Sequence, residues 1–296
     1  MLPRLMRHLL PTLLALAAAL LPVAAHAADE LMPTLRDVTS IRAMGKAGAS
    51  IGYGADTDAI HANPAAIAAT PGFNLMLGGF IGIPSRFYVF TVEGMDSKIN
   101  EDMTIPVSGG LSYQYYVSGD GFQGRKGHVL SVSMAVPMYS KVAYVGITGR
   151  YLKMGGNVVS NAITMDAGFF FRPIEMMGIG LTGYNLIDVR SAEARRGWGA
   201  GISFGSEKQF HVDVDARLDE DATRTYKPTF TVGGEYLFAG TVAPRIGYSE
   251  DLYRGAHLLC AGISVIYEGW AFEAAYRQAI VGKEITFALG LRMVEF

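Results

Sequence analysis

The sequence alternates between apolar and polar residues along most of its length, and this period of two constrains the fold more than any other feature. The clearest example is the stretch from residue 210 to residue 219, which reads FHVDVDARLD. Every second side chain from Phe210 to Leu218 is apolar, and the side chains between them are ionisable. Such alternation predicts a β-strand with one apolar and one ionic face. The same pattern recurs in residues 230–236 and 270–277.

The overall composition is apolar without offering a transmembrane helix. Half of the residues are hydrophobic, yet no run after residue 27 reaches the roughly 18 apolar residues that such a helix needs. A closed transmembrane β-barrel combines these properties, because lipid-facing and lumenal side chains alternate along each strand. A soluble β-sandwich would also alternate, but about a quarter of its residues would be charged, whereas this chain has 18%. The composition therefore favours a barrel.

Turn residues divide the chain after residue 72 into about fourteen strands of roughly 9–11 residues, the length that a tilted strand needs to cross a bilayer. The expected strands are 73–82, 85–93, 104–117, 127–139, 142–153, 160–172, 175–187, 196–206, 208–218, 226–238, 241–249, 256–267, 269–280 and 284–295. Long, charged connections at 117–126, 189–196 and 218–225 contrast with tight ones at 238–241 and 267–270. We therefore predict an all-β protein, a fourteen-stranded antiparallel transmembrane barrel of the outer-membrane type.

The first 27 residues have the organisation of a secretory signal peptide. Arg4 and Arg7 precede an apolar run that ends in the small-residue site Ala25-His26-Ala27. Export together with the strand pattern predicts a location in a bacterial outer membrane. Outer-membrane lipid, and the barrel-assembly machinery during biogenesis, are then the expected partners.

Charge, cysteine and histidine content argue against several other classes of function. A formal net charge of −2 provides no basic field for nucleic acid. The single cysteine, Cys260, excludes an intrachain disulfide and a thiolate metal cluster. The histidines after residue 27, at positions 61, 128, 211 and 257, lack the spacing of a metal site. We expect no nucleic-acid partner, no metal and no cofactor.

Two letter patterns typical of enzymes lie in the wrong structural context. Residues 178–183 read GIGLTG and residues 201–205 read GISFG. Dinucleotide-binding and nucleophile-elbow motifs place their glycines in a turn between a strand and a helix. Both patterns here alternate inside expected strands, where glycine relieves curvature and crowding. His211 beside Asp213 fits a hydrolase fragment or a lumenal ionic ladder, and we predict that the protein is not an enzyme.

A short stretch before the first expected strand is helical instead. Asn63 and Pro64 form a helix start, because Asn caps the first amides and Pro at the first position gives up an N–H that would have no partner. The helix is expected over residues 64–69, and Asp56 or Thr57 is a candidate cap for a shorter turn that ends at Ala62. Both pieces are too short to be stable alone, so surrounding structure must hold them.

This stretch resembles the N-terminal region of the FadL superfamily of long-chain fatty-acid and hydrocarbon transporters, including its PorV-like branch. The similar residues are Gly45, Gly48 and Gly52 in GKAGASIG, Asp56 and Asp58 in GADTDA, and Asn63 and Pro64 in NPA. The resemblance covers residues 41–70 well and the rest of the chain as strand pattern. In that family the N-terminal segment folds into the lumen as a hatch before the first of fourteen strands. The resemblance thus implies a signal peptide over 1–27, a hatch over 28–72 and a barrel over 73–296.

A plug is also expected on physical grounds, because a barrel of this size is wider than its side chains alone can fill. The alternation predicts a set of ionic residues that face the lumen: Arg150, His211, Asp213, Asp215, Arg217, Glu235, Glu273, Arg277 and Arg292. Two interpretations of Asp56 and Asp58 remain open. These carboxylates pair with lumenal arginines such as Arg150, Arg277 or Arg292, or they serve as turn caps.

The third expected strand contains residues that disturb a β-ladder. Pro106 lacks an N–H donor, and the pair Gly109-Gly110 permits a kink. FadL-type transporters have an inward kink in their third strand that opens a lateral gap to the bilayer. The segment is either the counterpart of that kink or an ordinary site of barrel curvature.

The resemblance implies a channel for passive uptake of a hydrophobic small molecule, such as a fatty acid, gated by the hatch. The alternative is a PorV-like barrel that serves protein secretion as a docking subunit, or a structural outer-membrane protein. The chain is much shorter than typical fatty-acid transporters, which favours the alternative. The expected partner is a hydrophobic ligand in the first case and a secretion partner protein in the second.

Overall fold

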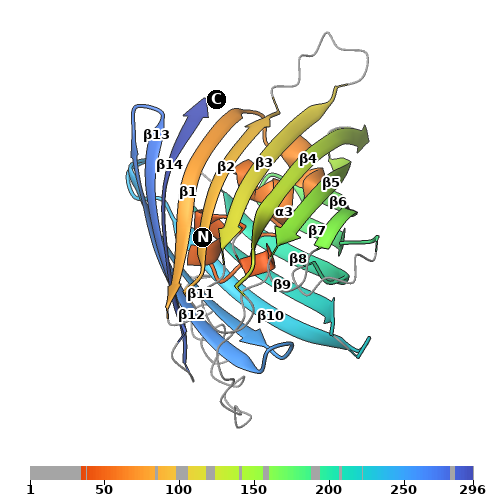
Figure 1. Cartoon of the computed structure of the whole chain (residues 1–296). Helices are drawn as coiled ribbons and strands as arrows, with labels where there is room; N and C mark the ends of the chain where they lie inside the picture. The colour runs from red at the N-terminus through yellow and green to blue at the C-terminus, as the bar shows by residue number, and fades with distance from the viewer. Residues whose placement is uncertain are drawn as a thin grey trace.

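The computed structural model describes residues 35–37, 39–83, 86–97, 106–117, 124–139, 142–155, 160–187, 194–206, 209–221, 223–280 and 284–295. Fourteen antiparallel strands in this part of the chain close into one barrel, in which each strand pairs with its neighbours in sequence and β1 pairs with β14 (Figure 1). The strands are β1 (Phe73–Ile83), β2 (Tyr88–Asp96), β3 (Ser108–Val117), β4 (Lys126–Tyr139), β5 (Ala143–Gly155), β6 (Ser160–Ile174), β7 (Met177–Tyr184), β8 (Gly197–Ser206), β9 (Phe210–Glu220), β10 (Tyr226–Tyr236), β11 (Val242–Asp251), β12 (Ala256–Tyr267), β13 (Trp270–Ala279) and β14 (Ile285–Glu295). The predicted fold class is confirmed. The expected signal peptide, residues 1–27, lies outside the described residues.

The third strand is shorter than the sequence predicts. It begins at Ser108, so Pro106 lies before β3 and does not interrupt it. A proline cannot donate to a ladder, and β3 starts at Ser108, which pairs with Ala135 on β4. Pairing then continues without a register shift through Gly109 and Gly110, on β2 as well as on β4.

Side chains alternate between the lumen and the outer surface along the strands. On β9 the carboxylates of Asp213 and Asp215 are buried in the lumen, whereas Val214 and Leu218 are 52% and 44% exposed on the outside. Large exposed apolar side chains occupy the outward positions of the other strands as well, for example Leu77, Phe90, Val132, Ile147, Ile163, Leu181, Ile202, Phe230, Ile246, Leu259, Phe272 and Leu289. An outward apolar surface over a polar lumen is the arrangement that a bilayer requires.

The two ends of the barrel differ in their connections. We call the end with the β3–β4, β7–β8 and β9–β10 connections the loop end, and the opposite end, where β1 begins and β14 ends, the short-turn end. The β12–β13 hairpin at the short-turn end has two central residues, Glu268 and Gly269, with φ values of 46° and 80°. Two successive positive φ values define the turn type that matches the twist of paired strands. The predicted contrast is present for these connections, whereas the β2–β3 connection, residues 97–107, is also long although it lies at the short-turn end.

In the described part of the chain, five short helices precede β1 and lie within the barrel (Figure 1). They are η1 (Leu35–Asp37), α2 (Ile41–Gly45), η2 (Asp56–Asp58), α3 (Ala59–Ala62) and η3 (Pro64–Ala69). Helix α2 contacts β11 to β14, whereas η3 contacts β3 to β6 on the other side of the barrel. Residues 39–72, which we call the lumenal segment, therefore span the lumen from wall to wall. No helix in the described part of the chain is long and apolar enough to cross a membrane.

A charge on the outer surface tests the lipid-facing assignment. Leu289 is 69% exposed and pairs with Gly79 and Ala274 in the middle of the neighbouring strands. Leu289→Arg is expected to lower the free energy of unfolding by about 2–4 kcal/mol, because the charge lies in hydrocarbon. Urea titration of the protein folded into lipid vesicles measures this loss. Ile83→Arg, at the end of β1, is the matched control with an expected loss of about 0–1 kcal/mol, and equal losses at both positions would contradict the assignment.

Candidate functional site

Asn63 starts a helix and at the same time fastens the lumenal segment to the barrel wall. Its side-chain oxygen accepts a hydrogen bond from the amide of Ala65 at 3.2 Å, and η3 follows as a 3₁₀-helix over the predicted residues. Its side-chain nitrogen donates to the carbonyl oxygens of Ile51, at 3.2 Å, and of Phe169 on β6, at 3.0 Å. One side chain thus joins two parts of the segment to the wall.

Lumen-facing glycines allow the backbone of the lumenal segment to lie directly against the wall. A Cβ atom at Gly180 would lie 1.9 Å from the carbonyl oxygen of Ile51, and one at Gly178 would lie 2.2 Å from that of Gly52. Wall glycines on five other strands would also bring a Cβ within 2.7 Å of atoms of the segment: Gly146, Gly168, Gly201, Gly233 and Gly247. Any side chain at these positions would displace the segment.

Sequence reasoning assigned these glycines to strand curvature and missed their contact with the segment. The sequence does contain a signal for this contact. Gly178 and Gly180 occupy the lumenal face of the strand, because they alternate with the outward-facing Ile179 and Leu181. Glycine confined to the lumenal positions of a strand indicates close approach of another backbone. Gly110 on β3 follows the same rule, since a Cβ there would lie 2.8 Å from the side chain of Ile60.

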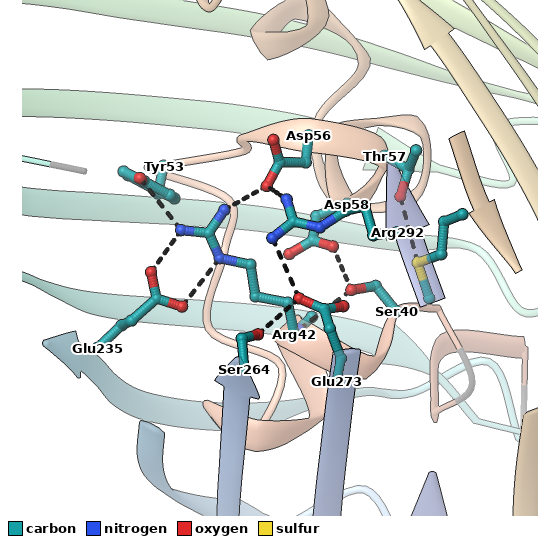
Figure 2. Close-up of polar contacts among 12 residues, drawn as sticks. Ser40, Arg42, Tyr53, Asp56, Thr57, Asp58, Glu235, Ser264, Glu273 and Arg292 are labelled. Atoms are coloured by element: carbon teal, nitrogen blue, oxygen red, sulfur yellow. Dashed lines mark hydrogen bonds and ion pairs between the residues drawn. The ribbon is translucent and has the colours of Figure 1, made fainter. Parts of the chain in front are cut away.

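A buried ionic cluster joins the segment to four strands (Figure 2). Arg42 on α2 donates to Asp56 at 2.5 Å and to Glu235 on β10 at 2.6 Å. Asp56 also accepts from Arg292 on β14, and Arg292 donates to Glu273 on β13 at 3.1 Å. Arg245 on β11 completes the cluster by pairing with both Glu235 and Glu273. The six members are Arg42, Asp56, Glu235, Arg245, Glu273 and Arg292, and all are buried.

The cluster contains three arginines and three carboxylates, so its charges balance. Burial by itself raises the pKa of the Asp56 carboxyl, but Arg292 and Arg42 outweigh it and hold that pKa below its usual value. Asp56 is therefore ionised at neutral pH. A buried ion pair that loses one partner leaves an uncompensated charge, which costs about 3–5 kcal/mol.

Asp58 has a different role from either sequence interpretation. Its carboxylate accepts a hydrogen bond from Ser40, and Ser40 in turn caps α2 by accepting from the amide of Ala43. Neither Asp56 nor Asp58 makes a side-chain cap on η2 or α3. The expected cap by Asp56 is thus wrong, because its carboxylate is taken up by arginines. Burial raises the pKa of Asp58 to about 6, although Arg42 and Lys46 oppose the rise.

A second cluster holds the turn after α2 against β9. Lys46 is fully buried, and its ammonium group lies 2.6 Å from the Asp213 carboxylate and 3.2 Å from Nε2 of His211. The ring of Tyr53 stacks on His211 with 3.9 Å between the ring centroids. Asp215 accepts from the backbone amides of residues 50 and 51 at 2.6 and 2.8 Å. The ionic face that the alternation predicts on β9 is therefore the docking surface of the segment.

A third set of ion pairs lies at the loop end. Asp37 of η1 accepts from Arg254 at 2.8 Å and from Arg277 on β13 at 3.0 Å. Arg36 beside it pairs with Asp219 and Asp251, on β9 and β11. These contacts fix the start of the described chain near the loop end, opposite the end at which β1 begins.

Two predicted lumenal arginines contact the wall and not the segment. Arg150 on β5 donates to Asp166 on β6 at 2.8 Å and to Asn185 at 3.1 Å. Arg217 pairs with Asp219 on the same strand at 2.9 Å, and its guanidinium lies 4.0 Å from the centroid of the Tyr184 ring. Of the three arginines proposed as partners for Asp56 or Asp58, Arg292 pairs with Asp56, whereas Arg150 and Arg277 have other partners.

Sequence reasoning missed His61 and Glu93, which link α3 to β2. Nε2 of His61 lies 2.8 Å from the buried Glu93 carboxylate, and that carboxylate also accepts from Thr91 and Ser112. Glu93 stands at a lumenal position in a strand of otherwise weak alternation. Its charge is the signal that could have identified it.

The enzyme-like patterns do not adopt enzyme-like geometry. Residues 178–183 lie inside β7 and residues 201–205 lie inside β8, and among the residues that the structure describes no helix follows either strand. Nδ1 of His211 lies 4.0 Å from Glu235, and its Nε2 faces Lys46. In the described residues no group of three His, Cys, Asp or Glu side chains is arranged to hold a metal ion.

The lumenal segment leaves one large cavity, toward the short-turn end. Its volume is about 720 Å³, and its lining includes Tyr53, Asp56 and residues 69–71 of the segment together with Arg172, Ile266 and Ala271 of the wall. Two further cavities near the loop end have volumes of about 30 and 80 Å³. Among the described residues, the segment therefore separates the large cavity from the two smaller ones.

Filling one wall glycine tests how closely the segment is docked. Gly180→Ala places a Cβ where the carbonyl oxygen of Ile51 lies, so residues 50–54 are expected to undock. Hydrogen exchange of peptides covering these residues is expected to accelerate at least tenfold. Gly79→Ala is the matched control, since an added Cβ there has 3.4 Å to its nearest neighbour and points outward. Unchanged exchange in Gly180→Ala would contradict the docking described here.

The two aspartates of the segment predict opposite effects of pH. Burial raises the pKa of Asp58 to about 6 when the segment is docked. The contribution of Asp58 to the stability of docking is therefore complete at pH values below its ordinary pKa, and it is lost as the pH rises through about 6. Asp58→Asn is therefore expected to increase hydrogen-exchange protection of the segment at pH 7, by on the order of 3 kcal/mol, and to flatten the change between pH 4 and pH 6. Asp56→Asn is the control, and it is expected to decrease the hydrogen-exchange protection at pH 7, because the pKa of Asp56 is lowered when the segment is docked. Equal effects of both substitutions at pH 7 would contradict this assignment.

Comparison with known proteins places this architecture among outer-membrane barrels. No family model and no curated protein sequence matches the chain. Among solved structures, one described as the CymD monoaromatic hydrocarbon channel is similar with a TM-score of 0.67 and 13% identity, covering 89% of this chain and 99% of that one. A Pseudomonas aeruginosa FadL homologue has a TM-score of 0.59 and 10% identity, covering 90% and 99%.

The Acinetobacter baumannii outer membrane protein Omp33 is similar with a TM-score of 0.50 and 8% identity, over 77% of this chain and 100% of that one. These three structures are described as a channel, a FadL homologue and an outer membrane protein, and none of these descriptions names an enzyme. At these identities the likeness concerns the fold. The resemblance to the FadL superfamily is confirmed at that level: the chain has the fold of a FadL-type outer-membrane barrel with a helical segment in its lumen.

Proposed function

We propose that the protein is an outer-membrane channel for passive uptake of small hydrophobic molecules, with the lumenal segment as its hatch. The short-turn end would face the periplasm, and the protein would bind ligand and membrane lipid without any catalytic step. The barrel-assembly machinery would insert it during biogenesis. The observation that carries the proposal is the way the segment closes the lumen beside a cavity of about 720 Å³. The similarity to a monoaromatic hydrocarbon channel and to a FadL homologue supports the class of ligand.

The ionic cluster is built so that the hatch can leave it at low electrostatic cost. Arg42 and Asp56 belong to the segment and neutralise each other, at 2.5 Å. The wall members, two arginines and two glutamates, remain paired among themselves through Arg245 and Glu273. The cluster therefore divides into two neutral halves. Neither half is left with the uncompensated charge that makes breaking a buried pair costly.

The ion pair of Lys46 cannot separate into neutral halves, so Lys46 is expected to anchor the segment to the wall. Its ammonium group belongs to the segment, whereas Asp213 belongs to β9, and both groups are fully buried. Separation would leave one cation and one anion without partners, at a cost of several kcal/mol. We therefore propose that the turn at Lys46 stays docked, while the side chain of Arg42 leaves the wall together with Asp56 as η2 and η3 move toward the cavity.

Residues 109 and 110 and Pro106 remain a proposed site of lateral exit. The ladders on both sides of β3 are continuous at the glycine pair, so an opening to the bilayer would follow motion of the hatch. Gly110 contacts Ile60 of α3. Withdrawal of α3 would remove the side chain that supports β3 at this point.

Uptake by cells tests the function. Cells that express the protein are expected to accumulate a labelled monoaromatic hydrocarbon or a labelled fatty acid faster than deletion cells. Ala271→Trp fills the cavity from β13 and is expected to reduce this uptake at least fivefold with the barrel folded. Phe272→Trp, the next residue along β13 with an outward side chain, is the matched control. Equal uptake by deletion and wild-type cells, for both kinds of ligand, would refute the proposal.

Native mass spectrometry with lipid extraction separates this function from its alternative. A retained acyl or aromatic molecule in the purified barrel would support the channel. An empty barrel that co-purifies with a stable protein partner would support a PorV-like docking subunit instead.

A further inference from the structure

The outer surface of the barrel carries two tyrosine–histidine pairs near the loop end. The hydroxyl of Tyr113 on β3 lies 2.7 Å from Nδ1 of His128 on β4. The hydroxyl of Tyr248 on β11 lies 2.7 Å from Nδ1 of His257 on β12. The two pairs share the same geometry and stand on separate parts of the barrel, so a difference in function must come from their neighbours.

The neighbours of the first pair are cationic. His128 lies directly opposite Lys153 in the ladder between β4 and β5, and Lys126 is two residues before His128 on the same face. All three side chains are exposed. These lysines are the two Lys or Arg residues at outward positions of the described strands, and they are diagonal neighbours across the ladder between β4 and β5.

Among the described residues of β3, β4 and β5, no carboxylate shares this face with the lysines. In the described parts of β3, β4 and β5 the remaining outward positions carry apolar residues, tyrosine or glycine. The second pair lacks such lysines, because Glu250 is the residue opposite His257. The same aromatic pair thus has two cations beside it at one site and an anion at the other.

The histidine of the first pair is held in place for donation to a ligand. The ring centroid of His128 lies 5.9 Å from that of Tyr113 and 5.1 Å from that of Tyr115. When Tyr113 donates to Nδ1, the proton of the neutral ring lies on Nε2, which is the free donor of the pair. Two lysines and one N–H donor are therefore neighbours on the outer surface at the loop end of β4 and β5.

We propose that Lys126, His128 and Lys153 form a binding site for the phosphorylated headgroup of a lipid in the outer leaflet, namely the phosphates of lipid A. Lysine binds phosphate as a point charge, and clustered basic residues at a membrane interface recognise anionic headgroups. The rings of Tyr113 and Tyr115 would contact the glucosamine or upper acyl region beneath the phosphate. The inference rests on the barrel lying in the outer membrane with its loop end outside, and it is independent of uptake.

Native mass spectrometry of the full-length barrel with added lipid A tests the site. The delipidated protein in neutral detergent is titrated with bisphosphorylated lipid A and, separately, with the same lipid after removal of both phosphates. Wild-type protein is expected to prefer the phosphorylated form. In Lys126→Gln/Lys153→Gln the affinity for this form is expected to fall on the order of thirtyfold, at about 1 kcal/mol for each lysine near the membrane surface.

Two matched controls separate the site from general electrostatics. Arg224→Gln/Lys227→Gln removes the same amount of charge at the loop end, where these residues pair with Glu220 and Asp221. His128→Gln is expected to weaken binding severalfold, whereas His257→Gln is expected to leave it unchanged. Equal binding by Lys126→Gln/Lys153→Gln and wild type, or an equal loss in the Arg224/Lys227 control, would overturn the proposal.

Folding and salt dependence keep the test decisive. Heat-modifiable migration in gel electrophoresis verifies that each variant is a closed barrel. If the double lysine variant does not fold, Lys153→Gln alone and a salt titration of the wild type replace it. Loss of phosphorylated lipid A with rising salt supports the site, and salt-independent binding, or equal binding of the dephosphorylated lipid, overturns it.

Discussion

The structure depends on filling a lumen that is too wide for side chains alone. A peptide backbone fills it, and this backbone lies against glycines of the wall. The close approach at Gly178 and Gly180 brings carbonyl groups of residues 51 and 52 to the wall without any intervening side chain. Barrel and segment are therefore matched to each other: the wall glycines leave room for the backbone of the segment, and helices of three to six residues have no stability without the wall.

Electrostatics adds a second property, because the charged contacts differ in how they can separate. Around Asp56 the segment and the wall are each neutral, so the charges on both sides stay compensated if the contact opens. At Lys46 a cation of the segment faces an anion of β9 in a dry environment. The balance of charge within each part, and not the number of ion pairs, decides which contact is an anchor and which can release.

Charged residues on the outer surface have a different environment from those in the lumen, because lipid and not protein is their neighbour. Most outward positions are apolar, and a charged residue there stands out because little else compensates for it. Lys126 and Lys153 are such residues, diagonal neighbours across one ladder at the loop end of the barrel. The lumen thus pairs its charges internally, whereas the outer surface offers its charges to the membrane.

The sequence by itself determined the barrel, because alternation with a period of two is a local property of each strand. It also predicted the helix at Pro64–Ala69 from Asn63 and Pro64, and the ionic face of β9. Tertiary structure alone decided which charges meet. Asp56 joins Arg42 and Arg292, residues 14 and 236 positions away, while Asp58 binds Ser40. The start of β3 after Pro106 and the role of the wall glycines were decided in the same way. Such contacts depend on the register of fourteen strands and on the path of the segment through the lumen, and no local pattern encodes either.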